Sequence, residues 1–110
     1  MSSGNIDAGT IKMYVDGVHD GTDTGGITGA INNPSGAIFI GRQGSATGQD
    51  WSGYICNVGV WGRVLTQSEI KSIMWKKYAD LTSSESTSLT SWWTLDANAN
   101  DSTGTNNGTT

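Results

Sequence analysis

Most hydrolytic chemistry in proteins depends on carboxylates and histidine. Glycoside hydrolysis by the usual route needs two carboxylates that flank the sugar, about 5–9.5 Å apart. The 110-residue chain has only two glutamates, Glu69 and Glu85, and neither falls in an expected strand. Its single histidine, His19, lies beside an expected turn, with no serine or cysteine motif nearby that indicates a triad. We therefore expect no catalytic residues and no enzymatic activity in this chain.

A polar stretch that ends at residue 51 has the residue types of a sugar-binding site. An exposed aromatic ring can stack on a pyranose, short polar groups can bind its hydroxyls, and such residues favour loops on a rigid scaffold. The candidate carbohydrate-binding residues are Arg42, Gln43, Gln49, Asp50 and Trp51. Trp51 has an alternative interpretation, in which its ring closes the edge of a β-sandwich.

A calcium ion takes about 6–8 oxygen ligands. Two clusters of Asp and Asn offer such oxygens: Asp16, Asp20 and Asp23 in the first, and Asp96, Asn98, Asn100 and Asp101 in the second. Neither has the ligand spacing of an EF-hand loop. Turn formation also explains Asp and Asn at these positions. No cofactor is expected, and Asp96 and Asp101 are the candidate calcium ligands.

Short apolar runs between turns must position these residues. Residues 11–15 alternate as a strand, and Asp16-Gly17 predicts a two-residue hairpin with a type I′ turn. The return strand starts at Val18 and becomes a loop or weak edge strand after Asp20. Residues 32–36 are expected to form a turn, and residues 37–41 a short buried strand.

A longer strand is expected from Trp51 to Trp61. Simple alternation would not bury Ile55 together with Val58 and Val60, so this strand needs a β-bulge near Cys56-Asn57. A bulge would also let Trp61 pack under the following helix. Cys56 is the only cysteine and is expected to be a small buried strand residue.

A short helix is expected at about 67–79. Thr66 and Glu69 form a capping box at its start. One buried stripe follows helical spacing: Ile70, Ile73, Met74 and Tyr78. Trp75 lies off this stripe and is a candidate interface residue or a packed structural one.

The segment Gly53-x-Ile55-x-x-Val58-x-Val60-Trp61-x-Arg63-x-Leu65-Thr66-x-x-Glu69-Ile70 resembles the closing segment of laminin G-like, concanavalin A-like jelly-roll domains. Residues 12–17 resemble the hairpin of that family, and residues 38–41 one of its strands. The resemblance implies an all-β fold, an antiparallel β-sandwich of the concanavalin A-like jelly-roll type with one short α-helix. Catalytic members of the superfamily carry Glu-x-Asp-x-x-Glu on one strand, a motif that this chain lacks.

The order of these motifs is permuted relative to a complete domain. Residues 1–80 resemble its closing half, residues 81–88 have the composition of a polar linker, and residues 89–110 resemble the opening strand and turn of the same fold. The chain is either a piece of a tandem-repeat protein or a small sandwich in which the late strand closes onto the earlier ones. Uncovered strand edges invite association, so we expect a homo-oligomer.

Trp92 and Trp93 lie in the expected late strand and must point to opposite faces. We expect Trp93, with Leu95, to be in the core. Trp92 is then left to cover another surface or an interface.

The amino-acid composition narrows the classes of partner that this chain is expected to bind. The net charge of −4 and the absence of a basic cluster argue against nucleic acid and anionic membrane surfaces. No apolar run approaches the roughly 20 residues that cross a bilayer, and the first residues do not read as a signal peptide.

Laminin G-like repeats rich in Gly, Asn and Thr resemble modules in surface or tail proteins of bacteriophages and marine microbes. The resemblance implies a non-catalytic carbohydrate- or cell-surface-binding module of a surface or phage virion protein. Its partner would be a glycan or host-surface polysaccharide, and its location the virion or the extracellular surface. The alternatives are a structural virion decoration or self-assembly protein with no sugar ligand, and an accessory domain of a larger glycosidase.

Overall fold

The computed structural model describes residues 11–24, 37–42, 44, 48 and 50–109. Its contacts divide the chain into two compact units, Met1–Trp51 (unit 1) and Ser52–Thr110 (unit 2). The division falls inside residues 1–80, which we expected to form one half-domain. The turn predicted at residues 32–36 lies outside the described residues.

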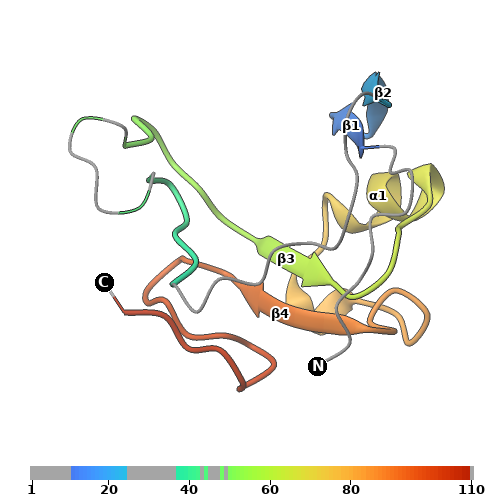
Figure 1. Cartoon of the computed structure of the whole chain (residues 1–110). Helices are drawn as coiled ribbons and strands as arrows, with labels where there is room; N and C mark the ends of the chain where they lie inside the picture. Colours follow the sequence, from blue (N-terminus) through green and yellow to red (C-terminus); the bar gives the residue numbers. More distant parts are fainter. Residues whose placement is uncertain (1–10, 25–36, 43, 45–47, 49, 110) are drawn as a thin grey trace. The chain divides into compact units, whose positions relative to one another are not determined.

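Unit 1 contains the predicted hairpin (Figure 1). Strands β1 (Ile11–Val15) and β2 (Val18–Asp23) pair antiparallel, with a register irregularity between Met13 and Tyr14. Asp16 has φ 51° and Gly17 φ 72°, the two left-handed conformations that a type I′ turn requires. The hairpin prediction is therefore confirmed, and the return strand extends to Asp23.

The buried strand predicted at residues 37–41 is not formed. Ile38 is 85% exposed, and the side chains of Phe39 and Ile40 are exposed as well. Gly41, with φ 79°, turns the chain and ends the extended run. The described part of unit 1 places no strand beside this run, so its apolar side chains lack a sheet against which to pack.

Unit 2 is built on a second antiparallel pair, β3 (Val58–Trp61) with β4 (Leu89–Trp93). Antiparallel sheets and one short helix make up the described regular structure, apart from a single 3₁₀ turn, so the fold class is all-β as predicted. Strand β3 starts later than expected. Asn57 adopts a left-handed φ of 52° and its N–H donates to the Thr94 carbonyl at 3.2 Å. The chain thus enters the sheet at Val58, and the register irregularity lies at the other end, between Val60 and Trp61.

Helix α1 (Gln67–Ile73) begins as the sequence predicts and ends early. The Glu69 N–H donates to Thr66 Oγ1 at 3.2 Å, and the Thr66 N–H donates to Glu69 Oε2 at 2.8 Å, which completes the capping box. The Lys76 N–H then donates to the Ile73 carbonyl at 2.9 Å, a tight turn that closes the helix. A short 3₁₀ turn, η1 (Tyr78–Asp80), follows. Neither helix in the described part of the chain could cross a membrane, because both are too short.

The core of unit 2 corrects our prediction for Trp92, which is 2% exposed. Its ring packs edge-to-face on Trp61 at a centroid distance of 6.0 Å, beside apolar residues of α1. Trp93, on the opposite face of β4, is also buried and donates its Nε1–H to the Asn106 carbonyl at 2.9 Å. Both faces of β4 are covered, so Trp92 is a core residue and is not available to an interface.

Candidate functional site

The candidate sugar-binding residues lie where a loop of unit 1 closes. Arg42 and Asp50 form an isolated antiparallel bridge, and the Trp51 N–H donates to the Gly41 carbonyl at 2.6 Å. We call these four residues the loop neck. The backbone is therefore paired at the neck, and the side chains of Arg42, Asp50 and Trp51 are exposed. Gln43 and Gln49, the other two candidates, lie outside the described residues.

The pairing also decides which side chains share a face. The Gly41–Trp51 hydrogen bond makes Arg42 and Asp50 a non-hydrogen-bonded cross-strand pair, the closer kind, with Cα atoms about 4.5 Å apart. Side chains alternate along a strand, so Trp51 faces the other side of the neck, opposite a glycine. The bridge pairs Arg42 with Asp50, and strand alternation puts the Trp51 ring on the reverse face of the neck.

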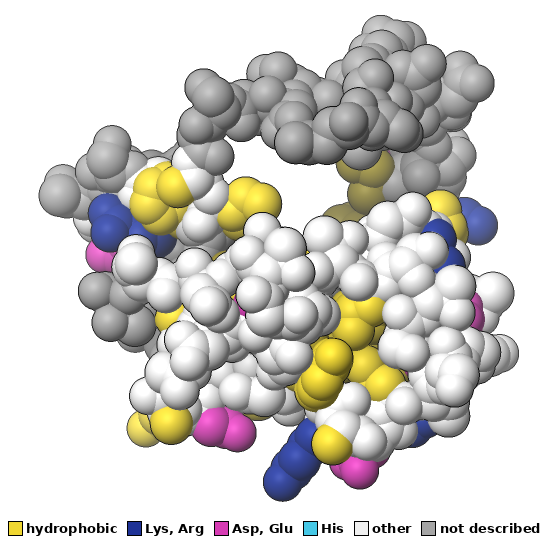
Figure 2. All heavy atoms as spheres, turned by 90° about the horizontal axis from the view of Figure 1, so that it is seen from below, with side chains coloured by type: hydrophobic (Ala, Val, Ile, Leu, Met, Phe, Trp, Pro, Cys, Tyr) yellow, Lys and Arg dark blue, Asp and Glu magenta, His cyan; other side chains and the backbone are white. Residues whose placement is uncertain are grey.

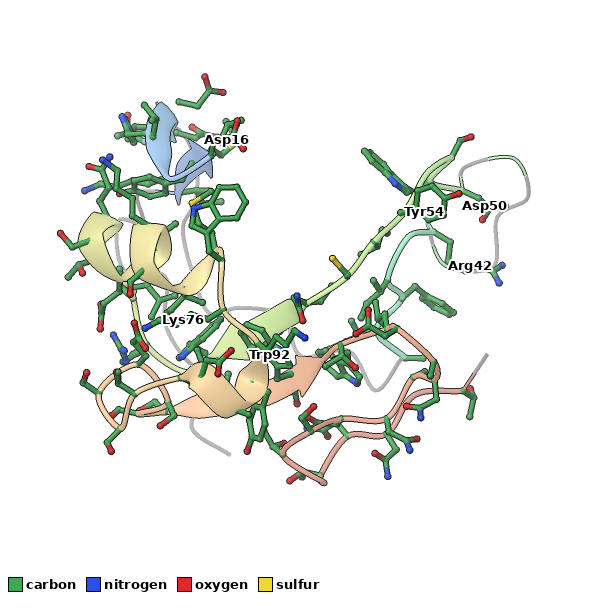
Figure 3. The ribbon with its side chains drawn as sticks, turned by 180° about the vertical axis from the view of Figure 1, so that it is seen from behind. Asp16, Arg42, Asp50, Tyr54, Lys76 and Trp92 are labelled. Atoms are coloured by element: carbon green, nitrogen blue, oxygen red, sulfur yellow. The ribbon has the colours of Figure 1, made fainter. Side chains whose placement is uncertain are left out.

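The two faces of the neck offer different chemistry. The Trp51 side chain is 65% exposed, and Gly41 opposite it has no side chain to cover the ring. On the polar face, the Arg42 guanidinium carbon lies 5.5 Å from the centroid of the Phe39 ring, a cation–π contact that holds the charge near the surface. Figure 3 labels Arg42 and Asp50 on this loop. A flat apolar ring and a donor–acceptor pair are the groups that bind sugars.

Asp101, a candidate calcium ligand, is occupied by protein donors. Its carboxylate is 4% exposed and accepts the N–H groups of Trp92 (2.9 Å), Thr103 (3.0 Å) and Asn106 (2.9 Å) and the Thr103 hydroxyl (2.7 Å). Burial alone would raise the pKa of this carboxyl, but the hydrogen bonds outweigh burial and hold the pKa well below its usual range. Asp101 thus fastens β4 to the segment that follows it.

Asp96, the other candidate ligand, is exposed. Among the residues that the structure describes, no three His, Cys, Asp or Glu side chains gather closely enough to hold a metal ion. The oxygens of Asp101 could bind calcium only by giving up the four hydrogen bonds above.

Glu85 is a buried structural carboxylate that sequence reasoning placed in a linker. Its Oε1 accepts from Ser72 Oγ at 2.7 Å, and both oxygens lie 2.7 Å from Lys76 Nζ. Its Oε2 also accepts from the Thr82 N–H at 2.8 Å. The Lys76 ammonium is the main cause that lowers the Glu85 pKa to about 2, followed by the Thr82 amide. Residues 81–88 are therefore an anchored turn, and a Thr-x-x-Glu pattern at 82–85, like that at 66–69, was the signal for it.

Arg63 anchors the same turn to the start of α1. Its guanidinium binds Glu69 through both terminal nitrogens, at 2.8 and 3.1 Å, and donates to the carbonyls of Ser84 (3.0 Å) and Thr87 (2.9 Å). The Arg63 hydrogen bond is the main cause that lowers the Glu69 pKa to about 2. Both glutamates of the chain are thus held in ion pairs.

Trp75, the remaining interface candidate, is 84% exposed just beyond α1. Trp92 was the other interface candidate, and the fold buries it. An indole this exposed on unit 2 is a surface available to a partner.

Comparison with known families adds one finding. Residues 3–71 match a laminin G-like family described as the concanavalin A-like lectin/glucanases superfamily. The match covers more than half of the chain and contains β1, β2, β3 and most of α1, whereas β4 lies outside it. No curated protein and no solved structure gives a significant match.

Proposed function

This chain belongs to the concanavalin A-like lectin/glucanases superfamily, and from that premise we propose that it is a non-catalytic module that binds a surface glycan. Membership supports a module of the carbohydrate-binding type, while the fold alone leaves the ligand open. The observation that carries the proposal is Trp51, whose ring is 65% exposed on a hydrogen-bonded neck. Stacking on a pyranose requires an exposed aromatic ring, and a hydrogen-bonded backbone helps to position that ring.

The polar face of the neck supports the same proposal. Arg42 can donate hydrogen bonds and Asp50 can accept them, so together they match the hydroxyls of a neighbouring sugar in a glycan chain. Because the ring and the polar pair occupy opposite faces, a chain of several sugars fits the neck better than one monosaccharide.

The two glutamates support a non-catalytic role. A general acid works best with a pKa near the operating pH. The pKa values of Glu69 and Glu85 are about 2, and each carboxylate is held by a cation, Arg63 or Lys76. Neither can donate a proton at neutral pH.

We further propose that the partner is a host-surface polysaccharide and that the module works on a virion or extracellular surface. The acidic net charge of −4 fits such a partner better than nucleic acid or an anionic membrane. One observation favours a second function, self-assembly into a homo-oligomer: Trp75 presents an indole that is 84% exposed on unit 2.

A thermal melt of the chain against a panel of oligosaccharides tests both functions. A ligand that binds only the folded state stabilises it by about 2.7 kcal/mol at a hundredfold excess over Kd. We expect a sugar-specific rise in Tm that is lost in Trp51→Ala and kept in Trp75→Ala, an exposed tryptophan of the other unit. A melt that depends on protein concentration, on Trp75 and on no sugar would favour self-assembly and reject the glycan proposal.

A further inference from the structure

A hollow lies on the C-terminal segment of unit 2 and contains no residue used above for sugar binding. After β4 the chain runs outward and doubles back on itself (Figure 1). The two arms border an open depression of about 440 Å³, lined by Ala97, Asn98, Ala99, Asn100, Gly108 and Thr109. This volume lies within the range of small-molecule sites, about 300–1,000 Å³. We call it the Asn98–Asn100 hollow.

The hollow is held in shape by hydrogen bonds within its lining and behind it. The Gly108 N–H donates to the Ala99 carbonyl at 2.7 Å, which joins the two arms. A Cβ on Gly108 would stand 3.0 Å from the Ala99 Cβ, so glycine allows this close approach. Behind the arms, Asp101 accepts from the Asn106 N–H and donates its own N–H to Asn107 Oδ1 at 2.9 Å. Fixed walls lower the entropy cost of binding.

The lining is uncharged and mixes polar Asn and Thr side chains with two alanines. Asn98 Oδ1 accepts from the Asn100 N–H at 2.9 Å, and this bond sets the orientation of the Asn98 carboxamide. Each carboxamide carries donors beside an acceptor, a pattern that matches two adjacent hydroxyls. On the face shown in Figure 2, uncharged polar and backbone atoms predominate over charged side chains.

We propose that the Asn98–Asn100 hollow binds a neutral sugar residue, through hydrogen bonds from the two carboxamides to neighbouring hydroxyls. A charged ligand would find no counter-charge among the lining residues. The hollow belongs to unit 2 and shares no residue with the Trp51 neck, so the two sugar contacts are independent of each other.

The test is a titration of the full ¹⁵N-labelled chain with the methyl glycosides of glucose, galactose and mannose, followed by amide chemical shifts. We expect saturable shifts at residues 97–100, at 108–109 and at the Asn side-chain amides. Asn100→Ala removes an exposed side chain and should weaken this binding at least about tenfold, which equals about 1.4 kcal/mol, the size of one hydrogen bond. Trp51→Ala is the matched control and should leave these shifts unchanged.

Three outcomes separate this inference from the proposed function. Shifts in the hollow that survive Trp51→Ala and vanish in Asn100→Ala support the inference, whatever happens at the neck. Chemical-shift changes that vanish in Trp51→Ala but persist in Asn100→Ala would support sugar binding at the neck and overturn the inference. Equal binding in wild type and in Asn98→Asp, which keeps the Oδ1 contact but replaces the amide donors, would also overturn it.

Discussion

Replacement of Asp101 by Asn tests how β4 is held in place. The exchange keeps the shape of the side chain and removes its charge. One carbonyl oxygen can still accept from the backbone N–H groups of Trp92 and Thr103, as Oδ1 does now. The new NH₂ group then takes the place of Oδ2, 2.9 Å from the Asn106 nitrogen. Two donors face each other there, and the Asn106 N–H loses its acceptor.

The expected cost follows from these contacts. A hydrogen bond to a charged acceptor is worth about 1.5–3 kcal/mol, and an unsatisfied buried donor costs about 1–3 kcal/mol. The Thr103 hydroxyl can rotate to accept from the new amide, so its bond is largely kept. We therefore expect Asp101→Asn to lower the free energy of unfolding by roughly 2–4 kcal/mol, a large share of the roughly 5–15 kcal/mol typical of a domain.

Urea unfolding followed by tryptophan fluorescence measures this change, because Trp92 and Trp93 are buried beside the site. Asp96→Asn is the matched control: it removes the same charge from an exposed position and should change stability by less than about 0.5 kcal/mol. A loss below about 1 kcal/mol for Asp101→Asn would refute the role of the four hydrogen bonds. Calcium should leave the wild-type midpoint unchanged, whereas a calcium-dependent rise that Asp101→Asn abolishes would show that Asp101 is a metal ligand.

Two further predictions concern packing and acid stability. Gly59→Ala should cost about 1–3 kcal/mol in urea unfolding, because its Cβ would lie 2.5 Å from the Trp61 ring and 2.9 Å from the Trp92 ring. Gly62→Ala, whose Cβ would meet nothing closer than 3.7 Å, is the control, and equal losses for both would contradict the argument. The pKa values of Glu69 and Glu85 are lowered from 4.5 to about 2, so their stabilisation is complete above pH 4.5 and is lost as the pH falls toward 2. Urea midpoints across this range should drop less steeply in Glu85→Gln than in wild type; identical slopes would show that the Lys76 pair adds no acid-sensitive stability.

Local chemistry explains which parts of the fold the sequence predicts. The Thr66–Glu69 capping box and the Asp16-Gly17 turn each involve residues within three positions of one another, so composition and spacing are enough to predict them. The end of α1 depends on distant partners. Lys76 leaves the helical path and forms an ion pair with Glu85, nine positions later. The i, i+3 and i+4 spacing of a helix does not predict a contact between these two residues.

Burial was harder to predict than secondary structure. Alternation assigned Trp92 and Trp93 to opposite faces, and it could not show that both faces of β4 are covered. Trp92 is buried because Trp61 and α1 pack over it, and Trp93 because the segment around Asn106 returns across it. In the candidate site, the sequence identified Arg42, Asp50 and Trp51 as neighbours, but only the pairing of the neck separates their faces.

The pairing of β3 with β4 has a consequence for how such modules can be recombined. Strand β3 lies inside the segment that matches the family, and its hydrogen-bonded neighbour lies beyond that segment. The boundary of the recognisable motif and the boundary of the folding unit therefore do not coincide. A duplication or gene fusion with its breakpoint between residues 81 and 88 would separate Trp61 from Trp92 and cut through the turn that Arg63 and Lys76 hold. A breakpoint just before Ser52 would move unit 2, Ser52–Thr110, as an intact module.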